Sequence, residues 1–354
     1  MDSRNLPFLS RSGNQESNAL LLYISGKQGR ERQVRDGRHL PGPAQQGFQS
    51  TQKIFVNTFE FYRFRFHFRA LDEVQFPPSK SGNVVRGAFG MVLRDTASPA
   101  TYQRLFQPVA PPGQHVPSGL VDWPRPFVLR ATHLDGHTFT PGDQFHFDVH
   151  IFELRQPFLG DFRSAFTELA EKGIGVRRGR AALDRVEQLD LSDSPIPDSD
   201  APQPSQVTLD RPEESVRAVQ LRFLSATELK TAGGLADRPE FPILLGRLRD
   251  RLSTLRSLYG PGPLEIDFRA IGERARTVRM VRCELTWERV ERKSGRTGQV
   301  HPLGGFLGEA DYEGDLAEFM PWLRVARWVG VGRQTVWGKG DVRVVGTSPG
   351  SVIR

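Results

Sequence analysis

The segment from residue 330 to residue 340 has the clearest potential for chemistry in this sequence. Its glycines leave backbone N–H groups that a ligand can approach without obstruction by a Cβ atom. Its two cations, Arg333 and Lys339, are side chains of the kind that bind phosphate. The four glycines are Gly330, Gly332, Gly338 and Gly340. A glycine-rich turn between a helix and an edge strand is the alternative interpretation, because glycine patterns alone have low specificity.

Further basic residues occur in three stretches upstream. Lys80 and Arg86 lie in a glycine-containing stretch, residues 79–94. A second group lies among glycines after residue 173: Arg177, Arg178 and Arg180. A third alternates with aromatic residues between 61 and 69: Arg63, Arg65, His67 and Arg69. We interpret the first two groups as candidates for phosphate contacts. Capping or salt-bridge roles are the alternative for the first group, and a solvated charge run is the alternative for the second. The third group forms the polar face of a predicted strand.

The net charge points to a polyanion as partner, although only a clustered charge would make a binding surface. The formal charge is +7, and residues 1–56 contribute +4 of it, from eight Lys or Arg less four Asp or Glu. That segment is polar and lacks periodicity, which is typical of a disordered extension or of a start codon assigned too early. A basic RNA-contacting tail is the alternative.

Several classes of protein are excluded by composition. Cys283 is the only cysteine, which excludes an internal disulfide and a multi-cysteine zinc site. His133 and His137 are four residues apart, but Gly136 lies between them, which argues against a zinc-binding helix. No apolar run reaches the ~18 residues of a membrane span. We therefore predict a cytoplasmic protein with no metal, no cofactor and no membrane association.

Periodicity predicts the elements of the first half. Alternation of apolar and polar residues predicts strands, and a 3.6-residue period predicts helices. The clearest strands are 59–68, 145–151 and 181–186, the helices are 79–94 and 158–172, and residues 98–126 are a loop rich in Pro and Gly. Gly87 and Gly90 lie inside the first helix, where each costs about 1 kcal/mol relative to Ala. Close approach of another backbone is the reason we expect for them.

The second half repeats this pattern after a linker. Residues 191–206 are rich in Ser, Asp and Pro and are predicted to be the linker. The predicted strands are 219–223, 281–287, 300–306 and one beginning at Val342, and the helices are 241–259 and 315–328. Pro321 either kinks the last helix or marks its true N-terminal turn.

Each half has the order strand, helix, strand, strand, helix, strand, which is the ferredoxin-like order. We therefore predict an α+β fold of two tandem ferredoxin-like (βαββαβ) domains with a C-terminal glycine-rich loop. The predicted parts are an N-terminal extension (1–56), an N-terminal domain (57–190), a linker (191–206) and a C-terminal domain (207–346). Two sheets that each carry helices on one face leave an open polar face or a cleft between them.

The combination of motifs resembles a known family. Pro77-Pro78-x-Lys80-x-Gly82-x-x-x-Arg86-Gly87-Ala88-Phe89-Gly90 and the terminal glycine-rich loop together resemble the CRISPR-associated repeat-processing endoribonucleases of the RAMP superfamily. Residues 125–129, 173–180 and 304–306 resemble family segments at corresponding places. The resemblance covers roughly residues 57–346. It implies two ferredoxin-like domains and a glycine-rich loop that contacts RNA.

The resemblance also implies a reaction. In this family the 2′-hydroxyl attacks the scissile phosphate without a metal and leaves a 2′,3′-cyclic phosphate and a 5′-hydroxyl. Such a reaction needs a base, a cation and an acid. The family often has a histidine in or just after the first helix, and this chain has none between Arg86 and Gln114. His67 and Tyr102 are the catalytic candidates, with surface exposure and packing as their alternative roles, and His115 is a weaker candidate.

The implied partner is CRISPR repeat RNA, together with other subunits of a CRISPR effector complex. The expected RNA contacts are Lys80, Arg86, Arg177, Arg178, Arg180, Gly330, Gly332, Arg333, Gly338, Lys339 and Gly340. A RAMP subunit that holds RNA without cutting it is the first rival, and the missing helix-associated histidine favours it. A small-molecule enzyme on a doubled ferredoxin-like scaffold is the second rival, because fold alone does not determine function.

Overall fold

A computed structural model of the chain describes residues 57–109, 123–197, 201–210, 212, 216–293 and 300–349. The predicted N-terminal extension, residues 1–56, lies outside the described residues, as does His115. None of the described helices is both long enough and apolar enough to cross a membrane. Cys283 is a free thiol.

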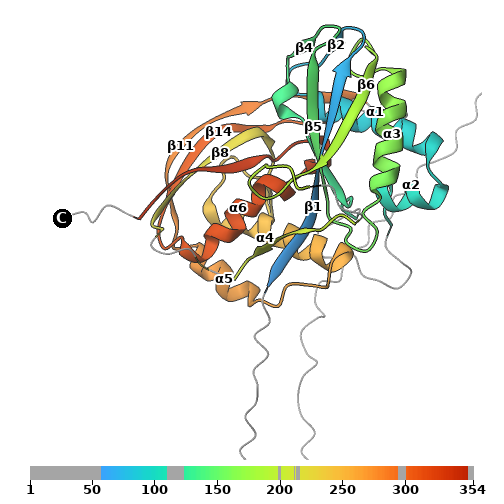
Figure 1. Cartoon of the computed structure of the whole chain (residues 1–354). Coiled ribbons are helices and arrows are strands. Elements are labelled where there is room, and N and C mark those ends of the chain that lie inside the picture. The colour runs from blue at the N-terminus through green and yellow to red at the C-terminus, as the bar shows by residue number, and fades with distance from the viewer. Residues whose placement is uncertain are drawn as a thin grey trace, which may run out of the picture. The chain divides into compact units, whose positions relative to one another are not determined.

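The N-terminal half is built around one antiparallel sheet. Its elements are β1 (Thr58–Ala70), β2 (Val74–Gln75), α1 (Ser81–Thr96), α2 (Pro99–Phe106), β3 (Phe127–Arg130), η1 (Thr132–Leu134), β4 (Thr138–Phe139), β5 (Gln144–Ile151), α3 (Leu159–Lys172), β6 (Ala181–Gln188) and β7 (Ser205–Thr208). The sheet order is β3-β5-β1-β6, and β7 pairs with the first residues of β1. Successive side chains of a strand point to opposite faces. Phe64, Phe66 and Phe68 therefore share one face, and they belong to the same apolar core as residues of α1 and α3. Figure 1 shows these two helices beside the sheet.

The C-terminal half repeats this arrangement. Its elements are β8 (Ala218–Thr227), β9 (Lys230–Thr231), β10 (Gly234–Leu235), α4 (Phe241–Tyr259), α5 (Phe268–Ala275), β11 (Arg279–Glu288), β12 (Glu291–Lys293), β13 (Val300–Pro302), β14 (Gly305–Glu313), η2 (Ala317–Phe319), α6 (Met320–Val329), η3 (Thr335–Trp337) and β15 (Val342–Ser348). The sheet order is β11-β14-β8-β15, with antiparallel neighbours. Leucines and aromatic residues of α4 and α6 pack on one face of this sheet.

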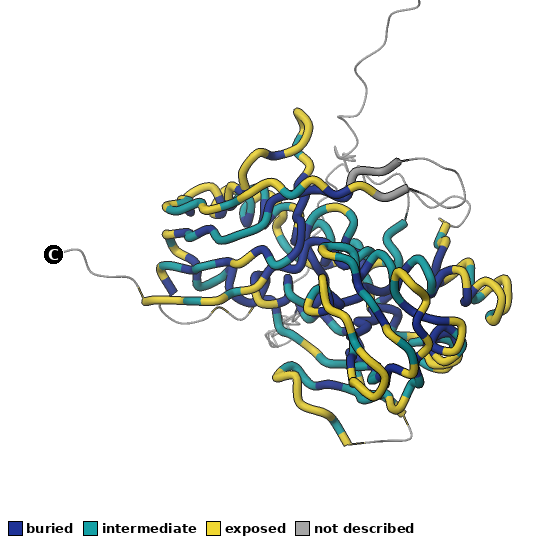
Figure 2. Tube along the Cα trace, turned by 90° about the horizontal axis from the view of Figure 1, so that it is seen from above, coloured by how far each residue is buried: buried dark blue, intermediate teal, exposed yellow. Residues whose placement is uncertain are grey.

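The two halves share strand β1. Phe59 and Phe61 belong to the apolar core of the C-terminal half, whereas the later phenylalanines of β1 belong to the N-terminal core. The ring of Phe61 lies 5.3 Å from that of Trp328 on α6. Burying one such side chain contributes about 1.5–3 kcal/mol. Figure 2 shows buried segments running through the interior of the described chain, with exposed residues in the connections and on outer helix faces.

Local capping signals explain two helices that periodicity missed. The loop prediction for residues 98–126 is wrong for α2, where Ser98 accepts a hydrogen bond from the Thr101 amide and Pro99 occupies the first turn. Asp267 caps α5 in the same way, through the amides of Arg269 and Ala270. Both helices have eight residues, too few for a long apolar stripe. Short capped helices are therefore the elements that a periodicity search overlooks.

The structure decides two further expectations, on Pro321 and on the glycines of α1. Pro321 lies in the first turn of α6, so it marks the N-terminal turn and does not kink the helix. A Cβ on Gly87 would meet no atom within 4 Å, and one on Gly90 would meet the ring of Phe106. The backbone approach expected for these glycines occurs instead at Gly82.

Candidate RNA-binding site

The glycine-rich segment 330–340 is a folded turn whose backbone repeatedly takes the left-handed conformation. Its glycines have φ values of 75°, 80°, 79° and 69°, in the left-handed region that favours glycine. Gln334 is also left-handed, with φ 65°. The four glycines are Gly330, Gly332, Gly338 and Gly340. Added Cβ atoms at Gly332 and Gly340 would lie 2.3 Å from the Glu228 carbonyl oxygen and 2.1 Å from that of Val331. These glycines are therefore needed for packing.

Most amides of this segment already donate hydrogen bonds within the protein. The amide of Val331 donates to the Gly340 carbonyl at 2.9 Å, and that of Gly340 donates to Ala226 at 3.1 Å. Those of Arg333 and Gly338 donate to the carbonyls of Glu228 and Thr335. The expected cradle of free backbone N–H groups is thus largely closed by the segment's own fold and by β8.

The segment docks on the N-terminus of α1. A Cβ on Gly82 would lie 2.8 Å from the Trp337 carbonyl oxygen, which shows how closely the two backbones approach. Arg86 is 6 % exposed, and its guanidinium lies 4.3 Å from the ring centre of Phe106 and 5.3 Å from that of Trp337. Arg86 therefore joins α1, α2 and the glycine-rich segment through cation–π contacts.

The two cations of the segment have different environments. Lys339 is 4 % exposed, and its Nζ donates to the Ser79 carbonyl at 2.9 Å and lies 3.5 Å from Glu288 Oε2. Burial lowers the pKa of Lys339, and the charge of Glu288 opposes this effect. Arg333 is half exposed and pairs with the buried carboxylate of Glu228. Arg333 can therefore reach a ligand, whereas Lys339 links the two halves.

The other predicted contacts lie near the connection between β1 and α1. Lys80 is the N-cap residue of α1 and is partly exposed. Arg177 and Arg180 form exposed ion pairs, with Glu73 at 2.9 Å and Asp72 at 2.7 Å. Arg178 is exposed with φ 54°. Exposed ion pairs are weak, so these guanidinium groups remain available to a phosphate.

The open face of the N-terminal sheet carries a row of ion pairs. Arg65 makes a two-point contact with Asp148, at 2.7 and 3.0 Å. His67 Nε2 lies 2.6 Å from Glu187 Oε2. Arg69 is the most exposed of the row and lies 3.2 Å from Asp184. The row therefore combines an oriented imidazole with arginines on both sides.

Three histidines gather on this face. The ring centre of His146 lies 5.7 Å from that of His67 and 4.6 Å from that of His133. Burial lowers the pKa of His146 to about 4, with further lowering by His133 and Arg65. His146 is therefore neutral at pH 7. His133 Nε2 lies 2.8 Å from the His146 carbonyl oxygen, which ties η1 to β5.

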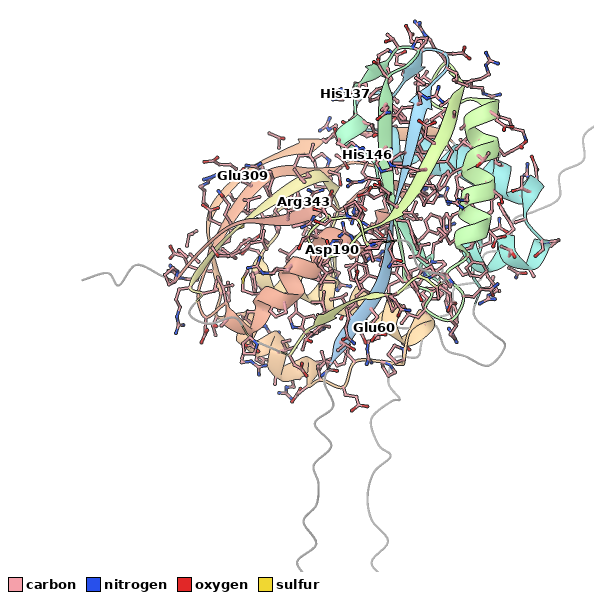
Figure 3. The ribbon with its side chains drawn as sticks, in the orientation of Figure 1. Glu60, His137, His146, Asp190, Glu309 and Arg343 are labelled. Atoms are coloured by element: carbon pink, nitrogen blue, oxygen red, sulfur yellow. The ribbon has the colours of Figure 1, made fainter. Side chains whose placement is uncertain are left out.

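The open face of the C-terminal sheet is also rich in arginine. Arg222 and Arg343 are cross-strand partners on β8 and β15, each about half exposed. Arg222 donates to Glu309 at 2.7 Å, and Arg282 of β11 donates to the same carboxylate at 2.9 Å. Figure 3 shows Arg343 and Glu309 on this sheet and His146 on the other one.

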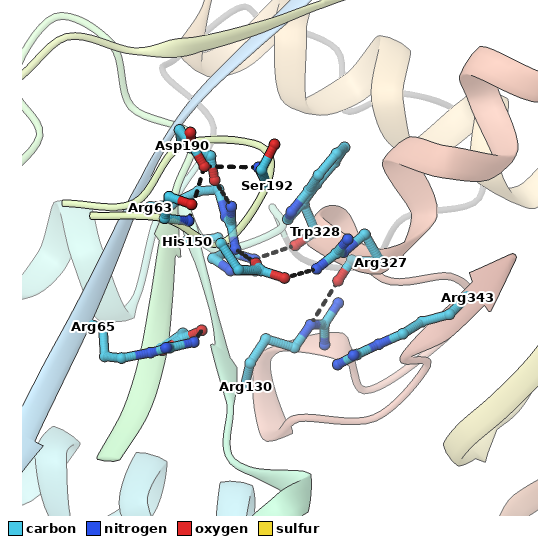
Figure 4. Close-up of polar contacts among 12 residues, drawn as sticks. Arg63, Arg65, Arg130, His150, Asp190, Ser192, Arg327, Trp328 and Arg343 are labelled. Atoms are coloured by element: carbon cyan, nitrogen blue, oxygen red, sulfur yellow. Dashed lines mark hydrogen bonds and ion pairs between the residues drawn. The ribbon is translucent and has the colours of Figure 1, made fainter. Parts of the chain in front are cut away.

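The two open faces converge at five arginines, which we call the junction arginine cluster (Figure 4). Its members are Arg63, Arg65, Arg130, Arg327 and Arg343. Asp193 contacts Arg63 of β1 and Arg327 of α6, so one carboxylate bridges the two halves. Burial opposes ionisation of Asp193, but the hydrogen bonds and charges of these two arginines outweigh it and lower its pKa. Asp193 lies in the predicted linker, and the Ser-, Asp- and Pro-rich composition of that stretch did not indicate that a residue of it would bridge the two halves.

Arg130 is the least compensated member of the cluster. It is 5 % exposed, and its Nε donates to the Arg327 carbonyl at 3.0 Å. Its two terminal nitrogens are buried and have no hydrogen-bond partner among the described residues. Burial lowers the pKa of Arg130, and Asp341 opposes this effect. Arg130 is therefore a buried positive charge between the sheets that has no hydrogen-bonded carboxylate among the described residues. Sequence patterns missed Arg130 because it ends a four-residue strand without a motif.

Comparisons with known proteins agree with this architecture. Residues 221–342 match the family model described as CRISPR-associated endoribonuclease Cas6. The match assigns this part of the chain to the Cas6 endoribonuclease family. Residues 59–209 match a second model, described as an N-terminal domain. No curated protein matches the chain.

Solved Cas6 structures share the fold. One is a Cas6 product complex, 19 % identical, with 81 % of this chain and 99 % of that chain covered and a TM-score of 0.51. Another is the partial Cas6-RT-Cas1–Cas2 complex, 13 % identical, covering 83 % of this chain and 47 % of that chain with a TM-score of 0.55. Thermus thermophilus Cas6 is 17 % identical, with coverages of 81 % and 98 % and a TM-score of 0.48. At these identities the likeness concerns the fold alone.

The two catalytic candidates lie on opposite sides of the N-terminal sheet. His67 projects from the open face toward Glu187, whereas Tyr102 on α2 packs against the apolar core, 5.5 Å from the ring of Phe106. The two side chains therefore cannot act on the same phosphate. Among the described residues, no group of three or more His, Cys, Asp or Glu side chains is placed to hold a metal ion.

Proposed function

We propose that this chain cleaves within CRISPR repeat RNA without a metal ion. The 2′-hydroxyl upstream of the scissile phosphate attacks phosphorus, and the departing 5′-oxygen takes a proton. The products are a 2′,3′-cyclic phosphate and a 5′-hydroxyl. The match of residues 221–342 to the Cas6 endoribonuclease family is the observation that carries this proposal.

The finer fold assignment belongs to the same proposal. We assign residues 57–190 and 207–346 as tandem ferredoxin-like domains joined by residues 191–206, with the glycine-rich loop near the C-terminus. Numbered by order within each half, the four main strands follow the order 2-3-1-4 in both sheets. That shared order supports the assignment, because it is the order produced when both helices of a βαββαβ unit cross on the same face.

The proposed RNA path crosses the open faces of both sheets. Arg69, Arg222 and Arg343 lie there with side chains about half exposed. The carboxylates that pair with Arg69 and Arg222 are partly exposed, whereas Asp341, the partner of Arg343, is buried. Exposed pairs such as those of Arg69 and Arg222 contribute about 0–1 kcal/mol, so a phosphate can replace their carboxylate partners at little cost. Arg343 can approach a phosphate only while it stays paired with Asp341. The junction arginine cluster adds positive potential between the two faces. Lys80, Arg333 and the three arginines after Gly173 are proposed as outer contacts.

His67 is the acid–base group that we propose. Glu187 holds one ring nitrogen at 2.6 Å, so the imidazole is oriented and its other nitrogen can face a substrate. Arg65 and Arg69 flank it on the same face of β1 and can stabilise charge on the phosphate. His146, which is neutral at pH 7, lies beside it and adds no competing positive charge.

Incubation of the purified full chain with end-labelled repeat RNA in excess EDTA tests the activity. We expect cleavage at one position, with products that resist 3′-end ligation until the cyclic phosphate is opened. RNA that is bound but uncut would favour the rival function, a RAMP subunit that holds RNA. That rival is supported by the lack of a histidine in α1 or α2.

Two substitutions decide which side of the sheet carries the reaction. His67→Gln is expected to reduce single-turnover cleavage about 100-fold or more, as removal of general acid–base catalysis does, with RNA affinity unchanged. Tyr102→Phe serves as the matched control and is expected to leave cleavage unchanged. The reverse result would place the scissile phosphate on the helical side, near α1 and the glycine-rich segment.

Association with other CRISPR proteins is a separate part of the proposal. One structure with this fold is titled as a Cas6-RT-Cas1–Cas2 complex. We propose that the present chain likewise works beside other CRISPR subunits. Co-purification of the tagged chain with neighbouring gene products from its native cells tests this, and recovery of the chain alone would contradict it.

A further inference from the structure

A hollow of about 510 Å³ lies on the helical side of the C-terminal half, away from the open sheet faces. It is formed by α4, α5 and the β9–β10 hairpin. The residues that matter for its chemistry are Lys230, Gly246, Arg249, Phe268, Arg269 and Gly272. Its volume falls within the range of about 300–1,000 Å³ that is typical of small-molecule sites.

Two glycines inside helices keep this hollow open. A Cβ on Gly246 of α4 would meet no heavy atom within 4 Å, and one on Gly272 of α5 would meet only the Arg249 side chain, at 3.7 Å. Neither residue has a left-handed backbone, so neither position needs glycine for its conformation. Each glycine costs its helix about 1 kcal/mol relative to Ala. Packing within the chain does not explain this cost, whereas space for a ligand does.

The charges around the hollow leave two cations uncompensated. Arg247 and Arg249 pair with Asp250, and Arg276 pairs with Glu273. Lys230 and Arg269 are exposed, and neither side chain has an ion pair or a hydrogen bond among the described residues. An anionic group that enters the hollow would therefore find two free partners.

An aromatic ring lies at the same place. Phe268 is 37 % exposed. The Arg249 guanidinium lies 5.0 Å from the centre of its ring, and Arg249 Nη1 also donates to the Phe268 carbonyl at 2.7 Å. The ring is thus held in place while more than a third of the residue remains accessible. An exposed aromatic beside free cations is the combination that binds a base and its phosphate.

We propose that the hollow between α4, α5 and the β9–β10 hairpin binds a nucleotide, with its base against Phe268 and its phosphate on Lys230 and Arg269. The nucleotide is either a free mononucleotide or one residue of a single-stranded RNA segment, because both present the same base and phosphate. This site is distinct from the open sheet faces, and it does not depend on the catalytic assignment.

The test uses the purified full chain and a fluorescent derivative of 5′-AMP as the probe. Binding is followed by anisotropy, with unlabelled 5′-AMP and a short oligoadenylate as competitors. We expect saturable binding that weakens as salt increases, because phosphate contacts release counterions. Displacement by the oligoadenylate at lower concentration than by 5′-AMP identifies RNA as the source, and the opposite order identifies a free nucleotide.

Gly246→Leu is the decisive variant, because it fills the hollow while improving helix propensity. We expect probe binding to weaken by about tenfold or more, with the melting temperature unchanged or raised. Gly160→Leu on α3 is the matched control, because a Cβ there also meets no atom within 4 Å and the site lies in the other half. The double variant Lys230→Ala with Arg269→Ala changes exposed side chains only, and we expect a similar loss.

The outcomes separate this proposal from the proposed function. No binding of the probe to the wild-type chain, or equal binding to Gly246→Leu, overturns the nucleotide site whatever the cleavage result. Cleavage of repeat RNA is measured on the same preparations. Its absence from the wild-type chain would contradict the endonuclease function and would leave the nucleotide site standing if probe binding is lost in Gly246→Leu.

Discussion

Gly82 and Gly338 lie back to back where the two halves of the chain meet. A Cβ on Gly82 would come within 3.1 Å of the Gly338 Cα, and one on Gly338 would come within 3.3 Å of the Gly82 Cα. The first turn of α1 thus rests directly on the glycine-rich segment. Both positions lack side chains because two backbones occupy the space that side chains would fill.

Gly82→Ala is expected to destabilise the fold by about 1–3 kcal/mol, the usual cost of overpacking. The added methyl would lie 2.8 Å from the Trp337 carbonyl oxygen, and the neighbouring atoms are backbone. Gly87→Ala in the same helix is the control, and we expect it to stabilise by about 0.5–1 kcal/mol, because its Cβ meets open space. Urea unfolding measures both, and equal effects would contradict the close contact.

Arg333 has a structural partner as well as a proposed ligand, and a double variant separates the two roles. Arg333→Ala is expected to cost about 1–3 kcal/mol, because it leaves the buried Glu228 carboxylate without its charged partner. Adding Glu228→Gln should recover much of that stability. RNA affinity should stay reduced in the double variant. If affinity returns together with stability, Arg333 does not contact RNA.

We expect Asp193 to make the free energy of unfolding depend on pH. Its pKa is lowered in the folded state, so its contribution is present above the ordinary Asp pKa, 3.8, and is lost as pH falls through the lowered value. Asp193→Asn keeps the shape and tolerates the observed φ of 66°. We expect it to reduce the free energy of unfolding at pH 7, with a gap from wild type that narrows below about pH 4. A gap that stays constant with pH would contradict an ionic bridge.

His146 should change the free energy of unfolding over a higher pH range than Asp193 does. Because its folded pKa is about 4 and its ordinary value is 6.5, the unfolded chain binds the proton more readily between these values. The stability linked to this side chain is therefore complete above about pH 6.5 and is lost as pH falls toward 4. His146→Gln should lessen the fall in unfolding free energy over that range. Imidazole NMR shifts that titrate near pH 6.5 would contradict the burial of this ring.

Arg222→Ala and Arg343→Ala test the RNA path across the C-terminal sheet. Each phosphate contact with single-stranded RNA contributes about 0.7 to the slope of log affinity against log salt, so each variant should flatten that slope by about this amount. Arg163→Ala on α3 is the control, because that arginine is exposed on the helical side of the other half. Unchanged slopes in the first two variants would contradict the path.

Sequence periodicity predicted the elements that are long and amphipathic. The alternating residues around Phe64 and His67 form β1. The leucine stripe forms α4, which begins at Phe241 and ends at Tyr259, as predicted. These patterns are strong because one face of each element is buried over several turns or residue pairs. The repeated element order followed from them. The family resemblance rested on the motifs, and the match of residues 221–342 supports it.

The parts that depend on tertiary contacts could not be predicted in this way. A lysine in a glycine-rich segment is expected at the surface. The ammonium group of Lys339 is instead buried against Ser79, which lies 260 residues away in the sequence. Asp193 lies in a stretch with the composition of a linker, yet it bridges both halves. No local pattern distinguishes a free backbone amide from one that a distant strand has already engaged. The closed form of the glycine-rich segment is a property of the whole fold.

The division of β1 between two apolar cores limits how the protein can move. A hinge within residues 191–206 would let the halves rotate only if Phe59 and Phe61 left the core that they share with α4 and α6. Withdrawing two phenylalanines costs several kcal/mol, about 1.5–3 for each, so rigid-body opening is disfavoured. An incoming RNA must accordingly be accommodated by exchange of surface ion pairs and by side-chain rotation, and recognition should be fast and nearly free of large-scale rearrangement.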